Sequence, residues 1–314
     1  MESEHLDNLE IGTASPSHYG AALWLATGGR TRHANRGRVT ALLAAEKQGR
    51  VSFEGLLTAT RGNRVVAALW CLQQPGRIAT VWGPGLLPNE PDTTAQALVE
   101  RSVQFARQAG SHLIQSLVGL ENPAAGNLLA QSGFRSITQL SHLQANIDEI
   151  SAEAPRPELR FVRCEDYRAE AFRDLVTATY QDSLDCPELD SIRQTSDVLD
   201  GYYATSSQST QNWYTIHSDE ETLGMVILAH HEVTNQVELI YFGLLPKYRR
   251  LGLGAEILRF TINVAAFLGC ESILTGVDQR NSPAVALYRR FGFQQAEAKE
   301  LFLLPLKSSS IAVA

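Results

Sequence analysis

The strongest constraint on the fold of this chain is an internal repeat of about half its length. The segment "GPGLLPNEPDTTAQALVERSVQFARQAG" (83–110) aligns with "YFGLLPKYRRLGLGAEILRFTINVAAFLG" (241–269), and "NPAAGNLLAQSGF" (122–134) aligns with "NSPAVALYRRFGF" (281–293). The two alignments have nearly equal offsets of 158 and 159 residues. Because self-similarity at a fixed offset is typical of a duplicated structural unit, the sequence predicts two copies of one domain.

The length of the chain agrees with this division. Its 314 residues suit two domains of about 150 residues each. The stretch "EISAEAPRPE" (149–158) contains two prolines and shows no apolar period, which is typical of a linker. We therefore expect a first domain at 1–148, a linker at 149–158 and a second domain at 159–314.

Composition excludes several classes of protein. Hydrophobic residues make up 44% of the chain and charged residues 19%, which indicates a soluble globular protein. The net charge of −7 argues against a nucleic-acid partner, and the apolar runs are too short to span a membrane. We expect a cytoplasmic protein. The four cysteines are scattered without a C-x-x-C pair, so we expect buried thiols and no metal site.

Hydrophobic periodicity gives the same order of elements in both copies: a strand, one or two helices, antiparallel strands, a loop and helix, a strand, a short helix and a last strand. In the first copy we expect helices near 16–28, 36–48 and 94–108 and strands at 53–60, 64–73 and 77–85; in the second copy we expect strands at 160–164, 212–218, 222–232 and 236–245 and helices at 166–180 and 190–204.

The stretch "RRLGLG" (249–254) carries the clearest chemical signal. It follows a predicted strand and leads into a predicted helix, so its glycines and the free N–H groups of the helix start favour an anion such as a phosphate. The loop is not a P-loop, because no lysine follows Gly254. It is not a dinucleotide fingerprint either, because Ile257 stands where that motif needs glycine.

Two motifs of the second copy resemble those of the GNAT acetyltransferase family. "RRLGLG" is similar to the family's coenzyme A pyrophosphate loop, and "NSPAVALYRRFGF" is similar to its second signature. The resemblance covers roughly residues 160–306. It implies an α/β (α+β) fold class with two tandem GNAT-like domains, each with a mixed, mostly antiparallel sheet flanked by helices. The layout is similar to that of the mycothiol synthases. The matching positions are Arg249, Gly252, Gly254, Asn281, Ala284, Leu287, Tyr288, Gly292 and Phe293.

The resemblance implies acetyl-CoA as cosubstrate and no metal. In this family the strand before the loop parts from its neighbour, so that the pantetheine arm fits between them. A backbone N–H there, that of Leu244, would polarise the thioester carbonyl. The cofactor-binding residues implied by the resemblance are Phe242, Gly243, Leu244, Arg249, Arg250, Leu251, Gly252, Leu253, Gly254, Ala255, Asn281 and Ala284.

The resemblance also implies two proton-transfer groups. Tyr288 would protonate the departing thiolate, although a tyrosine packed between helix and sheet is the simpler alternative. Glu238 would take the proton of the attacking amine, and a solvated carboxylate at the sheet edge is the alternative. His230 or His231 could replace Glu238 as the base, but neighbours on a strand face opposite ways. Asn281 would reach the pantetheine arm or, alternatively, cap the helix that follows it.

The acceptor and the role of the first copy are less well specified. The stretch 181–201 carries six acidic residues, which would attract a cationic amine or form a solvated helix face. In the first copy "PDTTAQ" (91–96) replaces the glycine loop and Leu129 replaces Tyr288, so this copy is expected to be degenerate. The leading interpretation is direct acyl transfer from acetyl-CoA to a primary amine of a small molecule or peptide. A catalytically silent acyl-CoA sensor or scaffold is the alternative.

Overall fold

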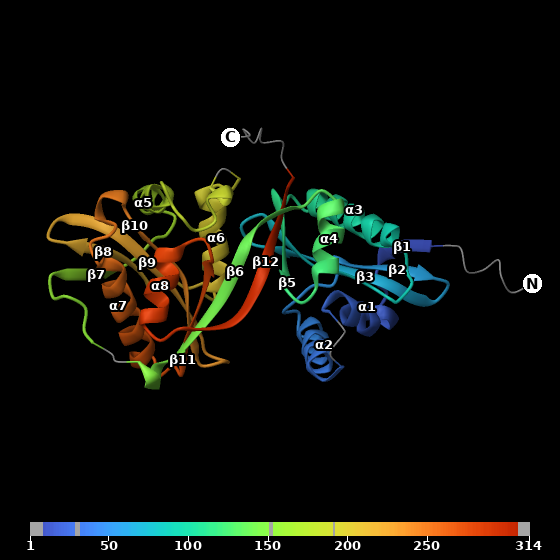
Figure 1. Cartoon of the computed structure of the whole chain (residues 1–314), viewed down its shortest axis with the longest axis horizontal. Coiled ribbons are helices and arrows are strands. Elements are labelled where there is room, and N and C mark those ends of the chain that lie inside the picture. The colour runs from blue at the N-terminus through green and yellow to red at the C-terminus, as the bar shows by residue number, and fades with distance from the viewer. Residues whose placement is uncertain (1–8, 29–31, 151–152, 191, 307–314) are drawn as a thin grey trace, which may run out of the picture. The chain divides into compact units, whose positions relative to one another are not determined.

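The computed structural model describes residues 9–28, 32–150, 153–190 and 192–306, and these form two compact units (Figure 1). Unit 1 comprises the chain up to Ile137 and the chain from Glu300 onward, and unit 2 comprises Thr138–Lys299. The elements follow one another in the same order in both halves of the chain, which confirms the predicted duplication. Each unit is described separately below.

Unit 1 has a mixed sheet between two helical layers. Its strand order is β1-β2-β3-β4-β5-β12; β1, β2, β3 and β4 pair antiparallel in turn, and β4 and β5 pair in parallel. Helices α3 and α4 contribute Leu98 and Leu129 to the core on one face, and α1 contributes Leu23 to the core on the other. The elements are β1 (Leu9–Thr13), α1 (Tyr19–Ala26), α2 (Arg32–Lys47), β2 (Leu56–Arg61), β3 (Arg64–Gln74), β4 (Ile78–Leu86), α3 (Asp92–Gln108), β5 (Leu113–Gly119), α4 (Pro123–Gln131) and part of β12 (Gln294–Pro305).

Unit 2 repeats this plan. Its strand order is β12-β6-β11-β10-β9-β8-β7, and again one pair, β10 with β11, is parallel. The helix expected at 190–204 begins only at Thr195, because residues before it form a short 3-10 turn and a loop. The elements are β6 (Arg135–Asn146), β7 (Leu159–Arg163), α5 (Glu170–Tyr180), α6 (Thr195–Thr205), β8 (Trp213–Ser218), β9 (Glu221–His231), β10 (Gln236–Leu244), α7 (Leu253–Phe267), β11 (Ser272–Asp278), α8 (Ser282–Arg290) and the rest of β12.

The two units exchange their last strands, and this moves the boundaries expected from the sequence. Residues 140–146 of β6 precede the linker, but they pair with β11 and complete the sheet of unit 2. The end of β12 comes from the second repeat, but Phe302 packs into the core of unit 1. The compact units therefore differ from the expected domains 1–148 and 159–314 at both ends. A strand's own sequence does not specify which sheet it joins, because such pairing is non-local.

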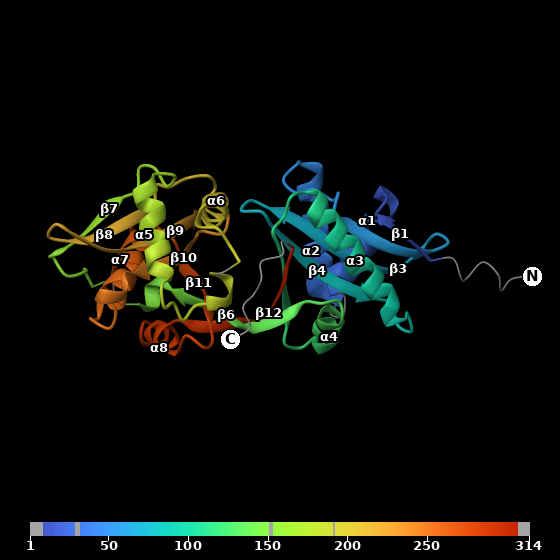
Figure 2. The same ribbon diagram turned by 90° about the horizontal axis from the view of Figure 1, so that it is seen from above.

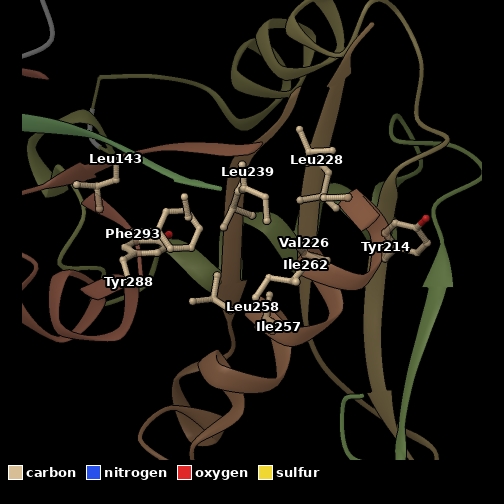
Figure 3. Close-up of a cluster of buried hydrophobic side chains, with 14 of the residues drawn as sticks. Leu143, Tyr214, Val226, Leu228, Leu239, Ile257, Leu258, Ile262, Tyr288 and Phe293 are labelled. Atoms are coloured by element: carbon tan, nitrogen blue, oxygen red, sulfur yellow. The ribbon is translucent and has the colours of Figure 1, made fainter. Parts of the chain in front are cut away.

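The core of unit 2 positions the site. Val237 and Leu239 of β10 pack against Leu258 and Ile262 of α7, and these residues belong to one buried cluster (Figure 3). On the opposite face of the sheet, Phe172 and Val176 of α5 and Leu199 of α6 belong to one buried cluster with the fully buried Trp213. Figure 2 shows α5 lying over this sheet. The alternation of side chains along β10 therefore sends neighbouring residues to two different helical layers.

Candidate active site

The parallel pair of strands in unit 2 opens partway along its length. β10 pairs with β11 only from Gln236 to Leu239, and the Oγ1 of Thr275 donates to the carbonyl of Leu239 at 3.0 Å near the last pair. Beyond this point β10 continues to Leu244 and remains paired with β9, which carries a register shift after Leu239. β11 continues beside β6. The facing edges of β10 and β11 therefore part, as the resemblance implied.

The end of β10 directs a backbone amide towards this opening. The N–H of Leu245 donates to the carbonyl of Leu223 in β9 at 2.9 Å. Because successive peptide groups of an extended strand point to opposite edges, the N–H of Leu244 points away from β9. Gly243 fits here because a Cβ atom would lie 2.5 Å from the hydroxyl of Tyr241. The backbone thus presents the donor that was expected at Leu244.

A loop of left-handed residues follows the strand and starts α7. Arg250 has φ 62° and Gly252 has φ 81°, and Gly252 is the N-cap of α7. A Cβ atom on Gly254 would lie 2.9 Å from the Cδ2 of Leu287 in α8, so glycine allows α8 to approach the helix start. Leu251 is 57% exposed, while Leu253 is buried in the core. The first turn of α7 therefore offers unpaired backbone N–H groups beside an exposed loop.

Arg249 has a different role from the one expected of its side chain. Its guanidinium donates to three backbone carbonyls, those of Leu244 at 3.1 Å, Asp182 at 3.0 Å and Thr179 at 2.9 Å. It thus ties the end of β10 to the end of α5. Any contribution of Arg249 to anion binding would come from its backbone, because its side chain is already occupied.

A basic residue that sequence reasoning assigned to the linker lies beside this loop. The Nη2 of Arg156 is 3.3 Å from the position that a Cβ atom on Gly252 would take. Its backbone N–H and its Nε both contact the carboxylate of Glu256, which is 3% exposed in the first turn of α7. Arg259 also pairs with Glu256 at 2.7 Å. Arg156 was missed because only the tertiary fold brings residue 156 to this helix start.

Tyr288 lies where β10 and β11 part. Its ring is 6.4 Å from that of Phe242 at the free end of β10 and 5.3 Å from that of Phe293 (Figure 3). Burial raises the pKa of the Tyr288 phenol, and a hydrogen bond with Thr275 only partly offsets this rise. The phenol therefore remains protonated at neutral pH and is available as a proton donor. Tyr288 also has a packing role, because this residue is only 5% exposed.

The other members of the second motif act mainly on local structure. The Oδ1 of Asn281 accepts a hydrogen bond from the N–H of Ala284 at 3.3 Å, so Asn281 is the N-cap of α8. Ala284 packs at the edge of the unit 2 core. Ala255, which follows the glycine loop rather than belonging to this motif, lies in the first turn of α7. The capping alternative for Asn281 is therefore the one that the structure displays.

Glu238 forms a side-chain hydrogen bond with one of the two histidines considered beside it. The Nε2 of His231 is 2.8 Å from the Oε2 of Glu238, and the side chains are 32% and 35% exposed. Val237 and Leu239 face α7, so Glu238 faces the layer of α5 and α6. The carboxylate is therefore neither buried nor fully solvated, and it has a partner that can hold its orientation.

The acidic stretch between α5 and α6 is largely occupied by contacts within unit 2. The N–H of Asp278, at the end of β11, donates to Asp185 at 3.0 Å, and Glu188 pairs with Arg280 at 2.6 Å. Asp200 contacts the hydroxyl of Tyr167 at 3.2 Å. Three of the six acidic residues of the stretch therefore hold parts of unit 2 together.

Unit 1 has the matching helix start without the glycine loop. Pro91 caps α3, and the carboxylate of Glu90 accepts a hydrogen bond from the hydroxyl of Thr94 at 2.6 Å and pairs with Arg61 at 2.9 Å. The hydrogen bond from Arg61 lowers the pKa of Glu90, so the carboxylate is ionised. A carboxylate of the chain itself therefore lies at the helix start where unit 2 presents its loop. Leu129, at the position of Tyr288, is completely buried.

In the described ranges, none of the helices is both long enough and apolar enough to cross a membrane. The same residues contain no group of three or more His, Cys, Asp or Glu side chains arranged to hold a metal ion.

Solved structures share this fold over nearly the whole chain. A GCN5-related N-acetyltransferase from Sphaerobacter thermophilus has a TM-score of 0.67 and 13% identity, over 96% of this chain and 97% of that chain. A tandem GNAT protein from the clavulanic acid biosynthesis pathway has a TM-score of 0.51 and 15% identity, over 96% of this chain and 100% of that chain. The chain therefore has the fold of tandem GNAT proteins.

Sequence comparison assigns the family for part of the chain. Residues 170–293 match the model of the acetyltransferase (GNAT) family, so this region is a GNAT domain. N-alpha-acetyltransferase 50 from Danio rerio is 31% identical over 72 residues, which are 23% of this chain and 43% of that protein. The match thus spans less than half of the curated relative.

Proposed function

We propose that unit 2 transfers an acetyl group from acetyl-CoA directly to a primary amine of a small molecule or peptide. The observation that carries this proposal is the parting of β10 from β11 beside the loop 249–254, with Tyr288 at the junction. A backbone donor, an anion-binding helix start and a protonated phenol thus converge on one opening.

The loop 249–254 and the first turn of α7 suit the pyrophosphate of coenzyme A. Glycine at 252 and 254 keeps this surface free of side chains, and the helix dipole favours an anion there. Arg250 is exposed, and Arg156 is held beside Gly252 by Glu256, so both side chains can add positive charge. Bound acetyl-CoA would supply the activated thioester, while Phe242, Gly243 and Leu244 would line its pantetheine arm.

Three groups would then carry the chemistry. Glu238 accepts a proton from the ammonium form of the acceptor, because only the free amine has a lone pair. The N–H of Leu244 stabilises the negative charge that develops on the carbonyl oxygen. As the C–N bond forms and the C–S bond breaks, Tyr288 donates its proton to the departing sulfur. His231 holds the Glu238 carboxylate in place during this sequence.

Direct transfer fits the state of the cysteines better than a covalent enzyme intermediate. All four thiols are buried, and burial raises the pKa of both Cys186 and Cys270. These thiols are therefore protonated at neutral pH, and a thiol is a much weaker nucleophile than a thiolate. Unit 1 would act as a degenerate copy, since Glu90 and the buried Leu129 stand where a donor-binding and a proton-donating group would be needed.

Calorimetric titration of acetyl-CoA into the intact chain, followed by thiol release with a panel of amines, tests the proposal. The intact chain is required because a cut at the linker would remove one strand from each unit. Glu238→Gln should retain acetyl-CoA binding and lose most thiol release, whereas His230→Gln should change neither. Binding without release from any amine would instead favour the silent sensor, and no binding would refute the site.

A further inference from the structure

Unit 2 also has a hollow on the side of the sheet that Glu238 faces. It is a cavity of about 360 Å³ between the end of α5 and the start of α6. Its lining combines three charged side chains, Asp182, Asp190 and Arg193, with polar and apolar residues: Thr177, Tyr180, Gln181, Leu189, Thr195 and Val198. The volume suits a small molecule rather than a folded partner.

Arg193 in this lining has an unsatisfied charged donor. Its Nε is buried and has no hydrogen-bond partner among the described residues. A buried guanidinium N–H without an acceptor is costly, so native proteins retain one mainly where another group completes it. The nearby Asp185 is already engaged by the backbone of Asp278. The Nε of Arg193 therefore still needs an anionic acceptor, although the carboxylates of Asp185 and Asp190 are close enough to interact with it electrostatically.

Asp190 neutralises the charge of Arg193 only in part. Arg193 and Asp190 line the same cavity, yet the described residues show no ion pair between them. Partial desolvation raises the pKa of Asp190 to about 6, and the nearby Arg193 only partly opposes this rise. A guanidinium in close contact with this carboxylate would hold its pKa low instead. The positive charge of Arg193 thus remains available to a ligand.

Tyrosine rings connect this cavity with the strand that carries Glu238. Tyr180 lines the cavity, and its ring is 5.4 Å from that of Tyr241 on β10. Tyr202 stacks on Tyr241 at 5.9 Å from the other side of the same cluster. Tyr241 lies between Glu238 and Gly243 in the sequence of β10. The rings of Tyr180 and Tyr241 thus run from the cavity lining to the strand that carries Glu238.

We propose that this cavity selects an acceptor amine that also carries a carboxylate, and that Arg193 binds this carboxylate. The inference rests on the acetyl transfer proposed for unit 2. The hydroxyl of Thr177 donates to the carbonyl of Arg173 at 2.8 Å and lies 2.7 Å from the hydroxyl of Thr195, so the guanidinium of Arg193 is the donor on which this binding depends. Charge-assisted hydrogen bonds to a carboxylate are among the stronger polar contacts in proteins. Small amino acids fit this chemistry better than the purely cationic amines that the acidic stretch had suggested.

Matched acceptor pairs that differ only in the carboxylate test the inference. The pairs are tyrosine and tyramine, histidine and histamine, lysine and cadaverine, and ornithine and putrescine. With the intact protein, at least one amino acid should have a kcat/KM well above that of its decarboxylated partner. Arg193→Gln should lower this ratio by about ten- to one-hundredfold, the range for a lost hydrogen bond to a charged group.

The control variant is Arg173→Gln, which removes an exposed arginine from α5 and should leave the ratio unchanged. A ratio near one for every pair, or a preference for the decarboxylated amines, would overturn the inference. An unchanged ratio in Arg193→Gln would do the same. Calorimetry with acetyl-CoA alone separates the two proposals, because intact coenzyme binding combined with turnover of amines lacking a carboxylate would leave the proposed function standing.

Discussion

Asp278 offers the sharpest test of how unit 2 holds its acceptor side together. Its carboxylate is completely buried at the end of β11 and accepts hydrogen bonds from the hydroxyl of Thr138 at 2.6 Å, the N–H of Cys186 at 3.1 Å and the Nη2 of Arg280 at 2.7 Å. One carboxylate thus joins β11 to β6 and to the segment between α5 and α6. Removing it should loosen that segment.

The cost can be estimated from these contacts. Asp278→Ala leaves the hydroxyl of Thr138 and the N–H of Cys186 without this acceptor and leaves the guanidinium of Arg280 paired with Glu188, and breaking a buried pair in this way costs about 3–5 kcal/mol. For a unit of this size each kcal/mol lowers the Tm by about 2–4 °C, so the Tm should fall by about 6–20 °C. Arg280→Met should cost less, about 1–3 kcal/mol, because the Arg280 side chain is 45% exposed.

A double-mutant cycle of Asp278→Asn and Arg280→Met, read by thermal and denaturant unfolding at pH 7, measures the coupling. We expect at least about 1 kcal/mol, because the two side chains share one contact. Burial alone would raise the pKa of Asp278, but the hydrogen bonds from Arg280 and Thr138 hold this pKa below its ordinary value. The stabilisation is therefore present above pH 4 and lost as the pH falls further. Additive effects at pH 7, or coupling that grows as the pH falls below 4, would refute this reasoning.

Three further predictions concern the site and the cavity beside it. Gly252→Asp should weaken acetyl-CoA binding at least a hundredfold, since it adds a negative charge at φ 81°, whereas Gly62→Asp at φ 60° in unit 1 should leave calorimetric affinity unchanged. Tyr288→Phe should lower kcat by about 10² with little change in coenzyme affinity, and an unchanged kcat would leave Tyr288 with its packing role alone. Asp190→Asn should stabilise the protein at pH 8 by less than about 1 kcal/mol and have no effect at pH 4. The reason is that burial raises the folded pKa of Asp190 to about 6, so ionisation of this carboxyl opposes folding above that pH. Equal unfolding midpoints for the Asp190 variant and the unchanged protein at pH 8 would contradict the last of these.

Local sequence patterns anticipated the elements that carry the site. The strand at 236–245 and the loop "RRLGLG" were expected close to the observed β10 and the start of α7. These features depend on near neighbours in the chain, because glycine at positive φ, helix starts and strand alternation are local properties. The N-cap that Asn281 forms on α8 was also one of the two roles expected for this residue from the sequence.

The sequence by itself determined the duplication, the order of elements and the place of the glycine loop, since repeats and periodicity are written along the chain. Tertiary structure decided which sheet β6 and β12 complete, that Arg249 binds backbone carbonyls, that Arg156 lies beside Gly252 and that Arg193 has a buried donor without a partner. Each of these depends on residues brought together from distant parts of the chain. Such contacts are set by packing and by the satisfaction of buried polar groups, which no local pattern records.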